Sequence, residues 1–200
     1  MRTVRAIFFA ATCAMGLARD GFGADIEQRG LRTVSGGRDE TMFTLRDEGE
    51  RIRFKFTVRD TTPCARPEIL SERELEKFDR VEIYFSPTPD LSRSYYCAEI
   101  DPYGHVLDYH VDVPGKFVFD WSFSTIAVRA ERSDGGYAVE GSVAKSELRT
   151  LGVNPDRCWI GVFRADFRTE GDVAGWYSAV PFCAGEPDFH QPKMFMRIGK

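Results

Sequence analysis

Two oppositely charged residues follow strand-like segments, and their chemistry suits the binding of a polar ligand. Asp60 comes two residues after Val58, so it keeps the parity of the buried face of that segment. Arg164 stands in the same relation to Ile160 and Val162. A carboxylate and a guanidinium at neighbouring strand ends can pair with each other or grip ligand hydroxyls through charge-assisted hydrogen bonds. We therefore treat both as candidate site residues, with a structural ion pair as the alternative for each.

A tryptophan in a glycine-containing segment is the next candidate. Trp176 directly follows Gly175, within residues 169–192, which we expect to form a long polar and aromatic loop. Glycines give the chain freedom to present the ring to solvent. An exposed ring stacks on the apolar C–H face of a sugar, while acids, amides or arginine hold the hydroxyls at its edge. Trp159 shares a strand face with Gly161, and we expect that ring to pack in the core.

Motifs of catalysis do not occur in the sequence. The G-x-S-x-G, Walker A, G-x-G-x-x-G and H-E-x-x-H patterns are all missing. His105 and His110 share a strand-like segment but differ by an odd number of positions, so an unbroken strand sends them to opposite faces. Any two of the 31 acidic residues could be imagined as a glycosidase pair, but sequence spacing does not test their separation. We expect no enzymatic activity.

Residues 1–18 have the features of a secretory signal. Arg2 and Arg5 precede an apolar run that is too short to span a membrane. Small residues place the cleavage after residue 18, or as late as residue 23, which leaves a single domain over 25–200. The formal net charge is −4 and no run of lysine or arginine occurs. We expect a secreted or periplasmic protein with no membrane span and no nucleic-acid partner.

Four cysteines remain once the signal, with Cys13, is removed. They are Cys64, Cys97, Cys158 and Cys183, and no C-x-x-C spacing indicates zinc or redox chemistry. An even number in an exported protein predicts two disulfides, with three connectivities open. Because the first and last lie in turn-rich segments and the other two in strand-like ones, we expect the pairs Cys64–Cys183 and Cys97–Cys158.

The elements that must position the candidate residues are mostly strands. Period-2 alternation of apolar residues, separated by turn residues, predicts strands over residues 42–46, 52–58, 81–85, 94–100, 105–111, 126–131, 137–144, 157–167 and 194–198. Only residues 71–78 and 146–151 have helical character. The predicted fold class is all-β: a two-sheet antiparallel β-sandwich, jelly-roll-like, with one or two short helices.

Short segments in both halves of the chain follow, in order, the pattern of a known family. They are Val58-Arg59-Asp60, FDRVEIYFSP at 78–87, YYCAEIDPYG at 95–104, GYAVEGSV at 136–143, WIGVFRAD at 159–166, Trp176, and FHQPKMF at 189–195. Over residues 41–198 the chain resembles the carbohydrate-binding module family 9-like domains, part of the DOMON-like β-sandwich superfamily. Each motif is short, and their collinear order carries the resemblance.

The resemblance implies a jelly-roll-like sandwich that binds sugar without chemistry of its own. Family members that bind sugar clasp a terminal saccharide between tryptophans, with acidic, amide and arginine side chains at its edge, and their bound calcium is structural. By motif position the implied carbohydrate-binding residues are Asp60, Glu82, Arg164 and Trp176, followed by Tyr96 and Glu99. Residues 61–77 contain no tryptophan where the sugar-clasping members place a second ring. Either one face of the clamp is open, or a tyrosine such as Tyr84 or Tyr96 substitutes, or sugar binding has been lost.

Three functions follow from these observations. The main hypothesis is an exported, non-catalytic protein that binds a mono- or oligosaccharide, or a chain end, through loops at one end of the sandwich. The alternative is a haem-binding or electron-transfer domain, because related sandwiches use Met and His as axial ligands and this chain ends with His190, Met194 and Met196. The third is a small glycoside-active enzyme.

Besides the haem of the alternative function, no cofactor is certain, and a structural calcium ion is possible. The oxygen-rich turns Asp47-Glu48 and Glu186-Pro187-Asp188 could ligate it in a structural role. The oligomeric state is not determined by the sequence.

Overall fold

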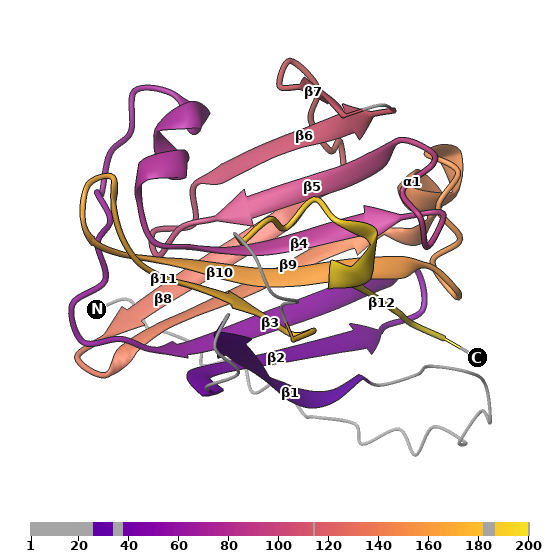
Figure 1. The fold of residues 1–200 in the computed structure, drawn as a ribbon. Coiled ribbons are helices and arrows are strands. Elements are labelled where there is room, and N and C mark those ends of the chain that lie inside the picture. Colours follow the sequence, from indigo (N-terminus) through magenta and orange to yellow (C-terminus); the bar gives the residue numbers. More distant parts are fainter. Residues whose placement is uncertain (1–25, 34–37, 114, 182–186, 200) are drawn as a thin grey trace, which may run out of the picture.

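The computed structural model describes residues 26–33, 38–113, 115–181 and 187–199 (Figure 1). The predicted signal segment, Cys183 and Glu186 lie outside these residues. In chain order the elements are β1 (Ile26–Thr33), β2 (Arg38–Asp47), β3 (Arg51–Arg59), the 3-10 helix η1 (Glu72–Lys77), β4 (Arg80–Ser86), β5 (Tyr95–Ile100), β6 (Val106–Asp112), β7 (Lys116–Val118), β8 (Ala127–Ser133), β9 (Gly136–Ala144), the α-helix α1 (Lys145–Thr150), β10 (Trp159–Thr169), β11 (Asp172–Ser178), the 3-10 helix η2 (Pro192–Met194) and β12 (Phe195–Arg197). None of the helices in this part of the chain is long and apolar enough to cross a membrane.

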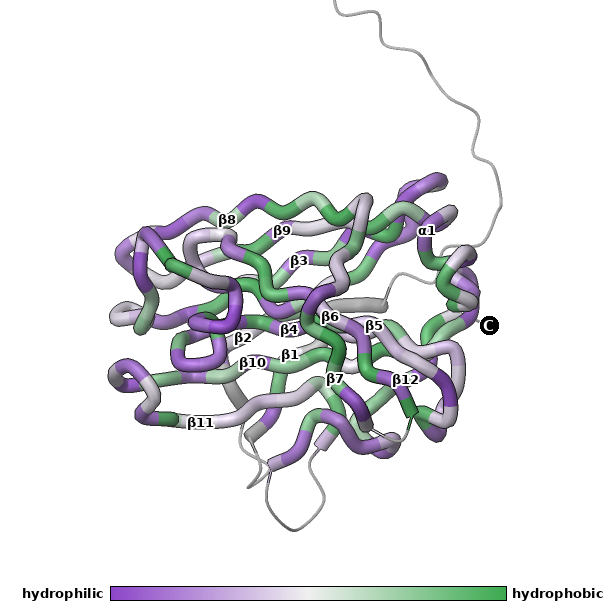
Figure 2. Tube along the Cα trace, turned by 90° about the horizontal axis from the view of Figure 1, so that it is seen from above, coloured by the Kyte–Doolittle hydropathy of each residue, from purple (hydrophilic) through white to green (hydrophobic). Residues whose placement is uncertain are grey.

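The strands form two layers that face each other across a core. One layer has the order β7-β6-β5-β4-β10-β11 and the other β1-β2-β3-β9-β8, with antiparallel neighbours. Pairing of β1 with β11 joins the layers into one hydrogen-bonded path. Seen from above, β8, β9 and β3 lie on one side and β10 and β11 on the other (Figure 2). The predicted all-β antiparallel sandwich is confirmed, and its two short helical segments correspond to η1 and α1.

Alternation along β3 fills the space between the layers. Ile52, Phe54, Phe56 and Val58 are buried, whereas the residues between them are exposed. They share one core with Phe43 of β2 and with inward-facing residues of β4 and β10. Removing each such side chain from water contributes about 1.5–3 kcal/mol to folding. This is the strand that the sequence pattern predicted most directly.

Strand β4 is buried on both faces. Val81, Ile83 and Phe85 point into the core between the layers, while Tyr84 belongs to a second hydrophobic cluster on the outer face of the same layer. Residues of η1 and of the segment 189–195 cover that cluster. Side chains that alternate along β4 therefore enter two separate interiors, and neither face of this strand is open to solvent.

The stretch predicted as a loop over residues 169–192 contains strand β11, so that prediction is wrong. The chain turns at Gly171, whose φ of 77° suits glycine, and β11 then pairs back along β10. Residues 172–178 have little apolar alternation, so this strand forms because its backbone hydrogen-bonds to β10 and not because of its side-chain pattern. Strand β1 and the three-residue strand β7 were not predicted either.

The expected disulfide between Cys97 and Cys158 is also wrong. Both thiols are free and buried, Cys97 in the outer cluster and Cys158 in the core between the layers. Strand β4 separates β5, which carries Cys97, from β10, which begins next to Cys158. Two strand spacings are about 9.6 Å, which is more than the roughly 7 Å that a disulfide can bridge between Cα atoms. The other expected pair involves Cys183, outside the described residues.

Candidate functional site

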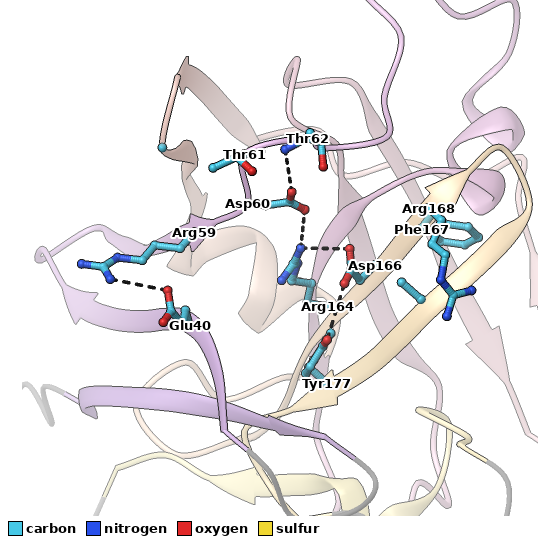
Figure 3. Close-up of a pocket in the computed structure, with 12 residues that line it drawn as sticks. Glu40, Arg59, Asp60, Thr61, Thr62, Arg164, Asp166, Phe167, Arg168 and Tyr177 are labelled. Carbon is cyan, nitrogen blue, oxygen red and sulfur yellow. Dashed lines mark hydrogen bonds and ion pairs between the residues drawn. The ribbon is translucent and has the colours of Figure 1, made fainter.

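A cleft of about 710 Å³ opens at one end of the sandwich. Four parts of the chain form it: Glu40 of β2, the end of β3 with the turn that follows, the β8–β9 turn, and the β10–β11 hairpin. The lining residues are Glu40, Arg59, Asp60, Thr61, Thr62, Gly135, Arg164, Asp166, Phe167, Arg168, Ala174 and Tyr177 (Figure 3). Most of them carry hydroxyl or charged groups, which suits a polar ligand.

Asp60 and Arg164 meet inside this cleft. Arg164 has inner-face parity on β10, opposite Val81 of β4 and Tyr177 of β11, where the apolar core gives way to polar residues. Its Nη2 lies 2.7 Å from Oδ2 of Asp60, and the two side chains are 3% and 13% exposed. Oδ1 of Asp60 accepts the backbone N–H of Thr62 at 2.9 Å, which holds the turn after β3. The ion pair is thus largely withdrawn from water, and its geometry is fixed on both sides.

Asp166 and Tyr177 extend the polar network. Nη2 of Arg164 donates to Oδ1 of Asp166 at 3.1 Å, and the hydroxyl of Tyr177 donates to Oδ2 of Asp166 at 3.5 Å. Figure 3 shows this chain of contacts running from Thr62 through Asp60 and Arg164 to Tyr177. The side chain of Asp166 is 20% exposed, so its carboxylate remains within reach of a ligand in the cleft.

Asp79 lies behind this network and is fully buried. Its carboxyl oxygens accept the backbone N–H groups of Phe167 at 2.6 Å and Cys64 at 3.2 Å, so it ties the turn after β3 to β10. Burial raises the pKa of Asp79 to about 8, and Asp166 and Asp60 raise it further, while the Phe167 hydrogen bond and Arg164 oppose the shift. Asp79 therefore carries a proton at neutral pH.

The three carboxyl groups of Asp60, Asp79 and Asp166 lie within 4.8 Å of one another, a spacing that could hold a metal ion. The guanidinium of Arg164 already bonds two of them. It supplies the positive charge that a cation would bring, and the third carboxyl is protonated. The donor set is therefore that of an arginine-centred network, and we assign no metal to it.

Two exposed ion pairs flank the cleft. Arg59 approaches Glu40 at 3.5 Å, and Arg168 approaches Asp172 at 3.1 Å, with all four side chains more than half exposed. Exposed pairs of this kind contribute at most about 1 kcal/mol. Both arginines can therefore exchange these partners for a ligand at little cost.

Glu82 and Glu99 lie elsewhere, on the outer face of the layer that contains β4 and β5. Nε of Arg80 is 2.9 Å from Oε1 of Glu82 and 2.6 Å from Oε2 of Glu99, and the three side chains are 8%, 1% and 7% exposed. The hydroxyl of Tyr84 donates to Glu82, and that of Tyr109 donates to Glu99 at 2.8 Å. This closed group, which we call the Arg80 cluster, is separated from the cleft by the sheet itself.

Charges within the Arg80 cluster shift one another's protonation. Burial raises the pKa of Glu82 to about 8, with repulsion from Glu99 adding to the shift and Arg80 opposing it. Nη1 of Arg80 also donates to three backbone carbonyls at the end of η1, those of Leu75, Glu76 and Phe78. The cluster thereby fastens η1 to the sheet, which is a structural role.

Solved structures with a similar architecture include two that are described as carbohydrate-binding. A candidate carbohydrate-binding protein from Bacteroides uniformis superposes with a TM-score of 0.65 at 15% identity, covering 86% of this chain and 85% of that one. A family 9 carbohydrate-binding module from Caldicellulosiruptor kristjanssonii, solved with cellotriose, superposes with a TM-score of 0.50 at 16% identity, covering 86% and 81%. The chain has a family 9-like fold. No protein-family model matches the sequence, and no curated protein matches it.

Within this family 9-like fold, Trp176 and Tyr96 take different positions from the cleft residues. Trp176 lies on β11 opposite Ala165, with its ring 5.8 Å from the guanidinium of Arg80 and 5.4 Å from the ring of Phe189. It is a partly buried strand residue rather than the exposed loop ring that we expected. Tyr96 lies in the core between the layers, and its hydroxyl donates to the carbonyl of Leu151 at 3.1 Å. Of the six expected residues, only Asp60 and Arg164 share the cleft.

The residues suggested as haem ligands pack in the two interiors. The ring of His190 stacks on Tyr84 at 5.2 Å, its Nδ1 is 2.9 Å from the hydroxyl of Tyr95, and burial lowers the pKa of His190 to about 4. Met194 belongs to the outer cluster, whereas Met196 belongs to the core between the layers. Met194 ends the 3-10 helix η2 and does not share the strand parity of Met196, so the two methionines pack in different hydrophobic clusters.

The acidic turns suggested for calcium have other partners. Asp47 pairs with Lys145, and Glu48 pairs with Arg53 at 2.8 Å. Asp188 accepts the backbone N–H of His190 at 2.8 Å, while Glu186 lies outside the described residues. Cationic side chains therefore neutralise the carboxylates of the first turn. In the second turn, Asp188 stabilises the backbone turn through its hydrogen bond to the N–H of His190.

Sequence reasoning did not single out several residues of the cleft. Asp166 shares the parity of Arg164 two positions earlier, and that signal was available. Thr61 and Thr62 follow Asp60 in a turn, and no pattern distinguishes them from other surface threonines. Tyr177 could not be found, because its position depends on the pairing of β11 with β10.

Proposed function

We propose that this chain is an exported, non-catalytic carbohydrate-binding protein that holds a saccharide in the cleft around Asp60 and Arg164. The observation that carries the proposal is the largely buried Asp60–Arg164 pair, exposed on one side to a cleft of about 710 Å³ in a sandwich of family 9-like fold. One protein of this fold was solved with cellotriose. Export to the periplasm or the medium is part of the proposal.

The chemistry of the cleft suits neutral hydroxyl groups. Asp60 and Asp166 offer acceptor oxygens, and the guanidinium of Arg164 bonds both carboxylates, so a sugar hydroxyl can donate to oxygens that are already held in position. Thr61 and Thr62 line the same wall, and their hydroxyls both donate and accept. The ring of Tyr177, over which Arg164 lies at 5.4 Å, supplies an aromatic surface.

The same geometry argues against hydrolysis. A glycosidase needs a protonated acid and a second carboxylate on either side of the scissile bond. Asp79 is the acid with a suitably raised pKa, but it is fully buried, and its oxygens accept hydrogen bonds from Cys64 and Phe167. Glu82, the other carboxyl with a pKa near 8, is held in the Arg80 cluster. Neither acid lines the cleft.

The test is calorimetric or NMR titration with glucose, galactose, mannose, xylose and cellotriose. We expect binding of at least one sugar and a loss of about tenfold or more in affinity for Asp60→Asn, because a hydrogen bond to a charged group is worth roughly 1.5–3 kcal/mol. Glu140→Gln is the matched control, since Glu140 is a carboxylate on β9 that pairs with Lys55 and does not line the cleft. Folded wild-type protein that binds none of these sugars, or Asp60→Asn that binds like wild type, contradicts the proposal.

A further inference from the structure

One arginine at the cleft end of the sandwich differs from those inside the cleft. Arg132 lies on β8 opposite Tyr137 of β9, and the next pair of that ladder, Ser133 with Gly136, leads into the β8–β9 turn. Gly135 of this turn lines the cleft, and Gly136 pairs with Arg59, which lines it as well. The β8–β9 and β10–β11 turns lie at the same end of the molecule in Figure 1. Arg132 therefore stands at the rim of the proposed site.

The charge of Arg132 is not balanced by a carboxylate in the described part of the chain. The arginines that line the cleft each have one: Arg59 has Glu40, Arg164 has Asp60 and Asp166, and Arg168 has Asp172. The contact described for Arg132 is instead with an aromatic face, since its guanidinium carbon lies 4.2 Å from the ring centroid of Tyr103. The guanidinium of Arg132 is thus held against a ring rather than against a carboxylate.

The ring under Arg132 is held by its neighbours. Tyr103 belongs to the β5–β6 turn, in which Oδ1 of the buried Asp101 accepts the backbone N–H groups of Tyr103 and His105, each at 2.9 Å. Oδ2 of Asp101 lies 2.8 Å from Nδ1 of His105, whose ring is 6.2 Å from that of Tyr103. This bond engages Nδ1 and directs Nε2 away from Asp101, and the His105 side chain is 27% exposed.

A guanidinium stacked on an aromatic ring keeps its N–H edge available, and that edge matches the two oxygens of a carboxylate. We propose that Arg132, positioned by Tyr103, is a carboxylate-binding group at the rim of the cleft, and that the preferred saccharides carry a uronic acid. The inference rests on the proposed carbohydrate function and specifies its substrate class. His105 offers Nε2 to a neighbouring hydroxyl of the same sugar.

The experiment compares D-glucuronate with D-glucose and D-galacturonate with D-galactose by NMR titration of the folded protein. We expect wild type to bind at least one uronate roughly fivefold more tightly than its neutral partner, since a partly exposed charge pair is worth up to about 1 kcal/mol. The preference disappears in Arg132→Gln and remains in Arg129→Gln. Arg129 is the matched control because it lies on the same strand but pairs with Glu131. Raising the salt concentration weakens the preference.

Tyr103 is tested as a positioning residue. Tyr103→Phe keeps the ring and is expected to keep the uronate preference, whereas Tyr103→Leu removes the ring and reduces the preference without changing binding of the neutral sugar. A structural role alone would make both sugars bind less well to Tyr103→Leu.

The outcomes separate this inference from the proposed function. Equal binding of uronate and neutral sugar by wild type, with both lost in Asp60→Asn, leaves the proposed function standing and overturns the role of Arg132. If Arg129→Gln and Arg132→Gln lose the uronate preference equally, the preference comes from the net charge of the protein, and the carboxylate-binding role of Arg132 is overturned as well. Binding of neither class of sugar by wild type overturns both.

Discussion

Replacing Asp79 by asparagine tests the electrostatics of the cleft most directly. Asp79 is fully buried, and its pKa is raised to about 8, from an ordinary value of 3.8. Between these two values the folded state binds one proton that the unfolded state does not. The free energy of unfolding of the wild type therefore falls as pH rises, by about 1.4 kcal/mol per pH unit from this group. Asparagine is neutral throughout, so Asp79→Asn lacks this slope.

The magnitude over the whole window is on the order of 5 kcal/mol. Near pH 4 the wild type is expected to be the more stable protein, because asparagine can accept only one of the two N–H bonds from Phe167 and Cys64, a loss of about 1–3 kcal/mol. Near pH 8 the order reverses, and the variant is the more stable. The wild type and the variant are compared at the same pH. The contributions of the other titrating groups, which both proteins share, therefore cancel in the difference in unfolding free energy.

The assay is urea unfolding followed by tryptophan fluorescence at pH 4, 5, 6, 7 and 8. Asp134→Asn, in the exposed β8–β9 turn, is the control, and its free energy of unfolding is expected to change with pH as that of the wild type does. If the free energies of unfolding of the wild type and Asp79→Asn also change in parallel with pH, Asp79 is ionised in the folded protein at neutral pH. That result would refute the account of Asp79 as the protonated support of the cleft.

Two further predictions concern the framework around the site. Arg80→Met leaves the buried glutamates of the Arg80 cluster without their cation and is expected to lower the free energy of unfolding by about 3–5 kcal/mol, whereas Arg53→Met, which breaks an exposed pair, costs about 1 kcal/mol or less. Equal effects in urea unfolding would contradict the buried pairing. Gly136→Ala is expected to cost about 2–4 kcal/mol, because Gly136 has a φ of 141° and an added Cβ would lie 2.0 Å from the carbonyl oxygen of Val58. Gly135→Ala meets no atom within 4 Å and should change the thermal midpoint little.

Strands with one buried face were predictable from the sequence. The alternation over residues 52–58 is a local property, because successive side chains on a strand point to opposite faces and only one face enters the core. The same parity argument placed Asp60 and Arg164 on the inner face, and in the structure they form one ion pair in the cleft. The expected strand end is wrong for Arg164, which lies within β10 (Trp159–Thr169). That part of the candidate site needed no knowledge of which strands are neighbours.

The fate of the other expected residues depended on strand pairing. Glu82 and Glu99 lie opposite each other on β4 and β5, so both carboxylates reach the same arginine under η1. The register of β11 against β10 turns Trp176 to the outer face and Tyr177 to the cleft. A shift of one residue in that register would exchange the two rings, and nothing in the order of the residues specifies it.

The sequence by itself thus determined the period of its strands, the sandwich class, and the side of the sheet on which Asp60 and Arg164 lie. Only the tertiary structure decided which charges are closed off and which remain open to a ligand. The reason is that periodicity is set within a single strand, whereas burial of a charge is set by the neighbours that supply its counter-charge. For Glu82 that neighbour is Arg80, under a cover formed partly by residues 189–195, more than a hundred positions away.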